Sequence, residues 1–178
     1  MGITLINRGM MCFVNELFRN VPIVGAEVGV LNGENALNIL QNMPNITLLY
    51  LIDPYEVYAE YLGDDAREIK GAKDIALQKL APLKNRIRWV YKKFEDCSEQ
   101  EIDQPLDFIY IDGNHAYEFV KKDIELSVRL VKKGGVIGGH DAGAPSVDKA
   151  YREYCEKENI FFMTPPGTKN DAGWDWLF

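Results

Sequence analysis

The sequence lacks the features that mark secreted, zinc-stabilised or membrane-spanning proteins. Its 178 residues include three cysteines, Cys12, Cys97 and Cys155, which lie far apart and form no Cys-x-x-Cys pair. This spacing disfavours a zinc site and a disulfide scaffold. No run of about 18 apolar residues is present to span a bilayer, and the first eight residues lack the basic start and apolar stretch of a signal peptide. We therefore expect a cytoplasmic protein with no membrane partner.

Positive charge is also scarce. Twenty Lys and Arg residues against 27 Asp and Glu residues give a formal net charge of −7, and the isoelectric point is near 4.9. Binding to a phosphate backbone relies on an excess of Lys and Arg, so nucleic acid is not expected as a partner. The chain is long enough to bury a large core, and 47% of it is hydrophobic. We expect one domain over residues 1–178, with residues 1–20 forming a short N-terminal helical segment.

Short apolar runs alternate with longer amphipathic segments, which is typical of βαβ units and a mainly parallel sheet. Runs rich in β-branched or aromatic residues predict five strands, at residues 21–28, 46–52, 87–91, 106–111 and 135–138. Helices are expected over residues 10–18, 33–41, 64–83, 116–131 and 147–158. Lys132 to Gly135 are expected to end a helix and to turn into the last of these strands. Phe161–Met163 and Trp174–Phe178, separated by a Pro- and Gly-containing connection, predict a terminal hairpin.

Acidic residues follow the first two expected strands, and open α/β sheets bind ligands beyond the carboxyl ends of their strands. The first strand leads through Glu27 into a glycine-containing turn that opens a helix, and the second ends at Asp53. A dinucleotide-binding turn needs further glycines where Leu31 and Glu34 stand, so a nicotinamide-dependent oxidoreductase is a distant alternative. Glu27 and Asp53 suit a ligand with an ammonium group, a sulfonium and a ribose diol. That ligand is S-adenosylmethionine.

Four segments, in order and at strand ends, resemble the class I S-adenosylmethionine-dependent methyltransferases. They are residues 27–33, 51–54, 107–117 and 134–141, and they include an Asp-Gly-x-His-x-Tyr motif and a later Gly-Gly-His-Asp. Within the class, the chain is similar to the small family with these motifs and to the catechol-type and macrocin-type O-methyltransferases. The resemblance implies a Rossmann-like, doubly wound α/β sheet of seven strands, mostly parallel with one antiparallel strand, in the order 3-2-1-4-5-7-6.

The resemblance also implies which residues contact the cofactor. Glu27, Gly29 and Gly33 would surround its methionine end, and Asp53 would accept hydrogen bonds from the ribose hydroxyls. The loop of residues 93–96 would flank adenine, with Phe94 offering an apolar face. Asn32 and Asp112 complete the expected cofactor-binding set. The alternatives are structural: Glu27 as a partner of the helix dipole and Asp53 as a turn-forming residue.

Two acids and both histidines of the chain, namely Asp112, His115, His140 and Asp141, follow the fourth and fifth expected strands. By resemblance to metal-dependent O-methyltransferases, Asp112 and Asp141 would hold a divalent cation, Mg²⁺ or Mn²⁺, that lowers the pKa of the acceptor hydroxyl. His140 is the third expected ligand. Because Mg²⁺ prefers oxygen, His140 either points away or favours a softer ion. His115 is the expected general base, with helix capping as its alternative. The expected catalytic set is Asp112, His115 and Asp141.

The leading hypothesis is an enzyme that transfers a methyl group to a small-molecule acceptor at a hydroxyl oxygen, with metal assistance. A metal-independent N- or O-methyltransferase and a non-catalytic S-adenosylmethionine-binding module stay open as alternatives. Asp123, which also belongs to the family pattern, is expected on the helix surface and is given no role. The site would be open, covered by residues 55–63 and 142–147, or completed by a second subunit in a homodimer.

Overall fold

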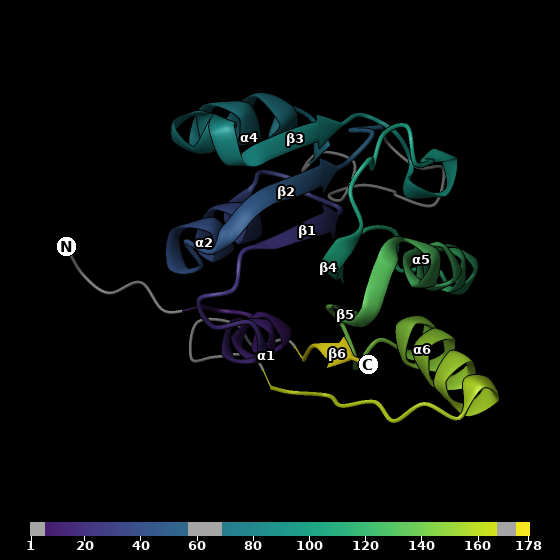
Figure 1. Ribbon diagram of the computed structural model, residues 1–178. Helices are drawn as coiled ribbons and strands as arrows, with labels where there is room; N and C mark the ends of the chain where they lie inside the picture. The colour runs from purple at the N-terminus through teal and green to yellow at the C-terminus, as the bar shows by residue number, and fades with distance from the viewer. Residues whose placement is uncertain (1–5, 57–68, 167–173) are drawn as a thin grey trace.

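The computed structural model describes residues 6–56, 69–166 and 174–178. Its centre is a twisted sheet in which strands from distant parts of the sequence lie side by side (Figure 1). The strands are β1 (Ile23–Val28), β2 (Ile46–Ile52), β3 (Ile87–Val90), β4 (Leu106–Ile111), β5 (Val131–Gly139) and β6 (Trp176–Leu177). Their order is β3-β2-β1-β4-β5-β6. The first five strands pair in parallel, and β6 runs antiparallel to β5. The expected Rossmann-like fold class is confirmed.

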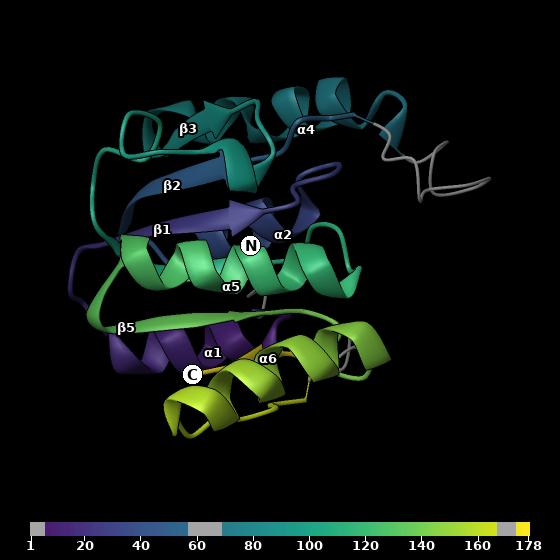
Figure 2. The same cartoon turned by 90° about the vertical axis from the view of Figure 1, so that its right-hand side faces the viewer.

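Helices cover both faces of the sheet and make a three-layered molecule. One face carries α1 (Gly9–Leu17), α2 (Glu34–Asn42) and α4 (Ala72–Leu80), and the other carries α5 (Tyr117–Leu130) and α6 (Pro145–Glu158). Figure 2 views the molecule from the side of α5 and α6, which lie across the strands. Two short 3-10 helices, η1 (Ala81–Arg86) and η2 (Phe94–Asp96), flank β3. In the described ranges, no helix has the length and apolar character needed to cross a membrane.

Two hydrophobic cores form because the central strands bury side chains on both faces, as parallel strands covered by helices must. On one side Met10 and Leu80 pack with Phe108 of β4, and all three are fully buried. On the other side Ile124 of α5 packs with Ile109 of the same strand. Alternate residues of β4 therefore face opposite cores, and this holds the carboxyl ends of the strands in one fixed row.

The chain after α6 is where the strand count differs from the expected seven. The structure shows six strands in the described residues, and Met163 makes a single antiparallel bridge to Leu177 of β6. β6 thus lies between β5 and this bridge, which is the place expected for the seventh strand. A second isolated bridge joins Pro166 to Trp174, and the Pro165 carbonyl accepts a hydrogen bond from the Asp175 N–H at 3.1 Å. Because proline provides no N–H, these contacts do not form a continuous ladder. The connection at residues 167–173 lies outside the described part of the chain.

Two predicted boundaries also need correction. β5 begins at Val131 rather than at residue 135, because Leu106 pairs with Val131 while Phe108 pairs with Val136. The extra residues of β5 form a bulge that contains Gly134, whose φ is 83°. The helix expected over residues 64–83 is seen as α4 followed by η1, with Pro82 in the first turn of η1. Residues 64–68 lie outside the described ranges.

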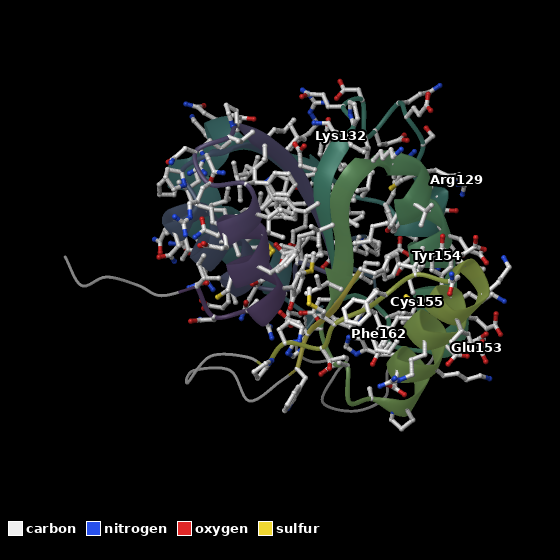
Figure 3. The ribbon with its side chains drawn as sticks, turned by 60° about the horizontal axis from the view of Figure 1, so that its bottom comes forward. Arg129, Lys132, Glu153, Tyr154, Cys155 and Phe162 are labelled. Carbon is white, nitrogen blue, oxygen red and sulfur yellow. The ribbon has the colours of Figure 1, made fainter. Side chains whose placement is uncertain are left out.

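Aromatic side chains fasten α6 to the edge of the sheet. Tyr151 stacks on Trp176 of β6 with ring centroids 5.3 Å apart, and Phe162 meets Tyr151 edge-on at 5.3 Å. Figure 3 shows Cys155 and Phe162 on the side of α6 turned toward the sheet, with Glu153 on the outer side. This packing fixes the last strand beside β5 and close to the loop that carries His140 and Asp141.

Candidate functional site

The loop after β1 is locked against the loop after β4. Gly29 has a φ of 83°, and a Cβ at this position would lie 2.1 Å from the carbonyl oxygen of Asp112. Only glycine permits both this conformation and this approach. Gly33 has a φ of 76° and precedes the first residue of α2. The two glycines therefore shape the turn, and Gly33 does so without lining the adjacent cavity.

Asp53, at the end of β2, holds this turn in place. Its Oδ2 accepts hydrogen bonds from the backbone N–H groups of Val30 and Leu31, at 2.9 and 3.0 Å. Its Oδ1 accepts a third from the N–H of Tyr55 at 2.7 Å. A carboxylate oxygen accepts about two hydrogen bonds, so Oδ1 keeps capacity for one more donor. The carboxylate is thus a structural acceptor whose remaining capacity is available to a ligand hydroxyl.

Glu27 is a buried acid with one oxygen left over. Its side chain is 1% exposed, and its Oε1 accepts a hydrogen bond from the Asn35 amide at 3.2 Å. Its Oε2 is buried and has no hydrogen-bond partner among the described residues. Burial, together with the negative charge of Asp112, raises the pKa of Glu27 to about 8. A buried acceptor without a donor is costly, so this position suits a cationic or hydrogen-donating ligand group.

A cavity of about 410 Å³ opens at the carboxyl ends of the strands. The predicted site residues that line it are Glu27, Gly29, Asn32, Asp53, Phe94, Asp112 and His115, whereas Gly33, His140 and Asp141 do not. Its walls also include Arg8, Phe119 and Asp123, to which the sequence assigned no function. The cavity volume lies within the range of small-molecule sites, roughly 300–1,000 Å³.

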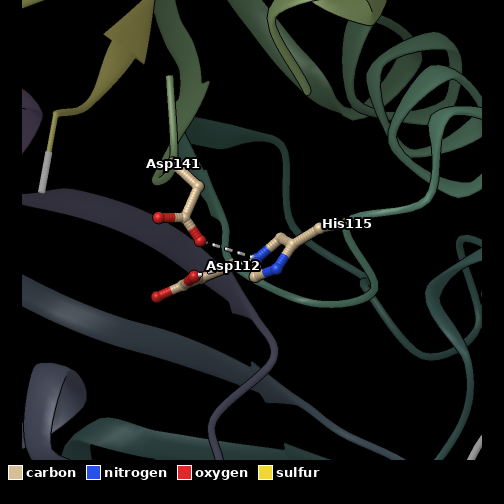
Figure 4. A group of neighbouring side chains, drawn as sticks. All are labelled: Asp112, His115 and Asp141. Atoms are coloured by element: carbon tan, nitrogen blue, oxygen red, sulfur yellow. Dashed lines mark ion pairs between the residues drawn. The ribbon is translucent and has the colours of Figure 1, made fainter. Parts of the chain in front are cut away.

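Asp112 and His115 line this cavity, and the Asp141 side chain points toward both of them (Figure 4). The Nε2 atom of His115 lies 3.4 Å from Asp112 Oδ1 and 3.4 Å from Asp141 Oδ2. One ligand atom from each of the three residues lies within 4.8 Å of the others. Asp141 has a φ of 56°, a conformation that is uncommon for a residue with a side chain. The tertiary structure thus holds two acids around one imidazole.

His140 stands beside this group. Its Nδ1 is 3.3 Å from Asp141 Oδ1 and 3.8 Å from Asp112 Oδ1. Both histidines therefore lie against the two acids, and His115 belongs to the group whose ligand atoms are all within 4.8 Å of one another. Burial lowers the pKa of His140, but the hydrogen bond that His140 donates to Asp141 and the charge of Asp112 outweigh this effect and leave the pKa raised. The same contact with His140 lowers the pKa of Asp141. Asp112 likewise raises the pKa of His115 against the effect of burial.

Arg8 is a site residue that sequence reasoning missed. Its Nη2 lies 3.6 Å from Asp112 Oδ2, and its guanidinium carbon lies 6.0 Å above the centre of the Tyr110 ring. The start of α1 is anchored by buried Asp175, which accepts hydrogen bonds from the Met10 N–H at 2.7 Å and the Tyr110 hydroxyl at 2.8 Å. No motif surrounds Arg8, so the sequence carried no signal for this placement.

Asp123 corrects a second prediction. It is 6% exposed and lines the cavity, so it does not lie on the helix surface. Burial raises its pKa to about 8. Phe119, one turn earlier on α5, lines the same cavity. A signal was available, because Asp123 falls between Val120 and Ile124, two residues of the apolar stripe that covers the sheet.

Comparison with known proteins agrees with this architecture. Residues 26–142 match the family described as a methyltransferase domain. No curated protein sequence matches the chain.

Several solved structures share the fold. An O-methyltransferase from Bacillus cereus, in complex with SAH, has a TM-score of 0.64 and 18% identity, over 99% of this chain and 83% of that one. An rRNA methylase from Streptococcus thermophilus has a TM-score of 0.62 and 13% identity, over 97% and 96%. A TDP-rhamnose 3'-O-methyltransferase of calicheamicin biosynthesis has a TM-score of 0.61 and 16% identity, over 93% and 76%. At these identities the likeness shows the fold alone.

Proposed function

This chain belongs to the methyltransferase-domain family, and from that premise we propose that it transfers a methyl group from S-adenosylmethionine to a hydroxyl oxygen of a small molecule. The observation that carries the proposal is the convergence of Asp112, His115 and Asp141 beside the cavity that Glu27 and Asp53 also line. A module that only bound the cofactor would need the acids after β1 and β2 but not the second group. This favours an enzyme over the non-catalytic alternative.

The cavity fits the proposed methyl donor. S-adenosylmethionine supplies a methyl group that its sulfonium activates for transfer. The unpartnered Glu27 Oε2 would accept a hydrogen bond from the ammonium of the methionine end, and Asp53 Oδ1 has capacity for a ribose hydroxyl. Leu31 has a φ of 48° and presents a side chain, rather than a glycine, at the loop. That loop suits a ligand without a pyrophosphate better than a dinucleotide.

His115 is the proposed general base. The residue lines the cavity, and its Nε2 lies 3.4 Å from each of two carboxylate oxygens, from Asp112 and Asp141. When the imidazole takes the proton of the acceptor hydroxyl, these carboxylates stabilise the imidazolium that forms. The raised pKa of His115 has the same electrostatic origin. Asp112 and Asp141 would therefore orient and support the base even without an ion.

The same three residues also fit a divalent ion. One ligand atom from each of Asp112, His115 and Asp141 lies within 4.8 Å of the others, so the three residues could hold one ion together. A divalent cation would supply Lewis acidity that lowers the pKa of the acceptor hydroxyl. Because one donor is an imidazole, Mn²⁺ suits the group better than Mg²⁺. In that form of the proposal His115 would hold the ion and would not act as the base.

Arg8 favours the metal-independent alternative. Its guanidinium stands 3.6 Å from Asp112 and already places a positive charge at one of the carboxylates that an ion would need. A cation in this position also balances the cluster of acids at the strand ends. The proposal therefore has two forms, one in which His115 acts as the base without an ion and one in which a divalent ion is bound, and metal dependence distinguishes them.

A small-molecule acceptor is favoured over RNA. Although an rRNA methylase shares this fold, the net charge of −7 gives the chain no general attraction for a phosphate backbone. The donor and acceptor would share a cavity of about 410 Å³ that His115 lines. A small acceptor bound in this cavity requires no extended basic surface.

Calorimetric titration of chelator-treated protein tests the proposal. We expect micromolar binding of S-adenosylmethionine, no binding of NAD⁺, and a separate Mn²⁺ signal that disappears in the Asp112→Asn/Asp141→Asn double variant. Glu118→Gln, an exposed change on α5, is the matched control. Absence of S-adenosylmethionine binding under every condition would overturn the proposed function. Binding of the methyl donor without a Mn²⁺ signal would select the metal-independent form.

A further inference from the structure

The carboxyl group of Asp123 lines the cavity and accepts no hydrogen bond from another side chain or from the backbone among the described residues. Asp123 lies on α5 where this helix packs against η2, and its charge acts on the thiol of buried Cys97. The Ser127 hydroxyl donates a hydrogen bond at 2.6 Å to the backbone oxygen of Asp123 and not to its carboxyl group. Because the residue is 6% exposed and lines the cavity, a donor reaches its carboxyl group from the cavity side. The position therefore calls for a donor that enters the cavity.

The charges near Asp123 do not provide that donor. The Nζ atom of adjacent Lys122 is 2.6 Å from Glu95 Oε2, with which it forms an ion pair. Glu95 itself is negative and raises the pKa of Asp123 further, after burial. A buried carboxyl next to another acid gains most from a neutral donor such as an amino group, or from a cation.

The cavity residues beside Asp123 indicate which kind of hydrogen-bond donor fits there. Phe94 from η2 and Phe119 from α5 both line the cavity, and Phe119 lies one helical turn before Asp123 on the same face. Two aromatic side chains and one acceptor fit a flat, apolar ring that carries an exocyclic amino group. Phe119 already has the Lys122 ammonium 5.9 Å from its ring centre, so a neutral ring suits these walls better than a second cation.

The direction of the methyl donor along the cavity agrees with this choice, and this step rests on the proposed function. In the proposed function, Glu27 binds the methionine end of the methyl donor, Asp53 binds its ribose, and His115 faces the transferred methyl group. The adenine ring must then lie against the remaining wall of the cavity. That wall contains Phe94 and Asp123.

We propose that Asp123 is the specificity-determining residue for adenine and accepts a hydrogen bond from its exocyclic amino group. Burial raises the pKa of Asp123 to about 8. Because a protonated carboxyl group keeps its carbonyl oxygen as an acceptor, the contact persists in either protonation state. The residue would thus distinguish adenine from purines that lack the 6-amino group.

The test compares two ligands on four proteins by calorimetry. The ligands are S-adenosylhomocysteine and its analogue with hydrogen in place of the 6-amino group. The proteins are the wild type, Asp123→Leu, Asp123→Asn and the exposed control Glu125→Leu. Leucine removes the acceptor and adds apolar volume of similar size, whereas asparagine keeps an amide oxygen that can accept. Circular dichroism and thermal unfolding would establish that each variant is folded.

We expect the wild type to bind S-adenosylhomocysteine about tenfold more tightly than the analogue, the amount that one buried hydrogen bond provides. Asp123→Leu should bind both ligands equally and S-adenosylhomocysteine about tenfold more weakly than the wild type does. Asp123→Asn and Glu125→Leu should keep the preference. Equal affinity of the wild type for both ligands, or an unchanged preference in Asp123→Leu, would overturn the role of Asp123 while the proposed function stands. Failure of the wild type to bind either ligand would overturn both.

Discussion

The side chains at the carboxyl ends of the strands form a row with two halves. These halves differ in how many hydrogen bonds their acids already accept from the protein. In the half formed by β1 and β2, Asp53 accepts three backbone hydrogen bonds and Glu27 accepts one from Asn35. In the half formed by β4 and β5, Asp112 and Asp141 face His115 at 3.4 Å, longer than a normal hydrogen bond. The first half is a scaffold whose shape is set before a ligand arrives, and the second is a cluster of reactive groups held close together.

The electrostatics of the two halves differ in the same sense. Burial raises the pKa of Glu27 to about 8, so that this acid tends to be neutral until a cationic ligand binds. Contact with His140 lowers the pKa of Asp141, which stays ionised. The comparison indicates that affinity for the methyl donor resides mainly in the first half and proton transfer mainly in the second.

Replacing the imidazole of the second half should have the largest effect. His115→Ala removes the proposed base, and we expect turnover to fall by about 10²- to 10⁴-fold. The affinity for S-adenosylhomocysteine should change by less than about threefold, because Glu27 and Asp53 in the first half are unchanged. Steady-state rates and calorimetry measure the two quantities on one preparation. An unaffected rate would leave His115 with a structural role.

Removing the central acceptor of the first half should reverse that pattern. Asp53→Ala leaves three backbone N–H groups without their acceptor, so the turn before α2 should loosen. We expect the affinity for S-adenosylhomocysteine to fall by about 10- to 100-fold. The free energy of unfolding should fall by about 1–3 kcal/mol, which lowers the melting temperature by several degrees. Asp53→Asn, which keeps one acceptor oxygen, is the matched control and should lose less. Unchanged affinity in Asp53→Ala would remove this residue from the cofactor site.

The pH dependence of stability should separate the halves in the absence of ligand. The unfolded chain releases the Glu27 proton near pH 4.5, while the folded protein holds it until about pH 8. Rising pH between these values therefore favours the unfolded state. Glu27→Gln should abolish this loss and raise the free energy of unfolding at pH 8, relative to pH 5, by on the order of 1–2 kcal/mol. Urea titrations at both pH values measure the free energy of unfolding. The same change between pH 5 and pH 8 in the wild type and the variant would refute the prediction.

The smallest expected effect concerns the cation at the border between the halves. Arg8→Met keeps an unbranched apolar side chain but removes the positive charge from beside Asp112. A partly exposed ion pair is worth at most about 1 kcal/mol, so Mn²⁺ affinity should rise by about two- to fivefold. Arg19→Met, on an exposed residue remote from this site, is the control. A fall in Mn²⁺ affinity would mean that Arg8 organises Asp112 rather than competing for it.

The fold and the row of strand-end residues could be predicted from the sequence because they follow local rules. Apolar runs of strand length, helical periodicity and glycine turns repeat along the chain, and parallel strands bring their carboxyl ends together. Glu27, Asp53 and Asp112 therefore fall near one cavity wherever the helices begin and end. The order of the strands came from the family resemblance, since periodicity carries no information on which strands are neighbours.

The tertiary structure decided the features that depend on contacts between distant segments. Arg8 reaches Asp112 because buried Asp175, from the far end of the chain, anchors the start of α1. Both His115 and His140 reach Asp112 and Asp141 because the loops after β4 and β5 meet. Asp123 faces a cavity because α5 packs on η2. Residue type and spacing determine which groups are available at the site, whereas side-chain direction and neighbourhood arise only when separate elements pack together.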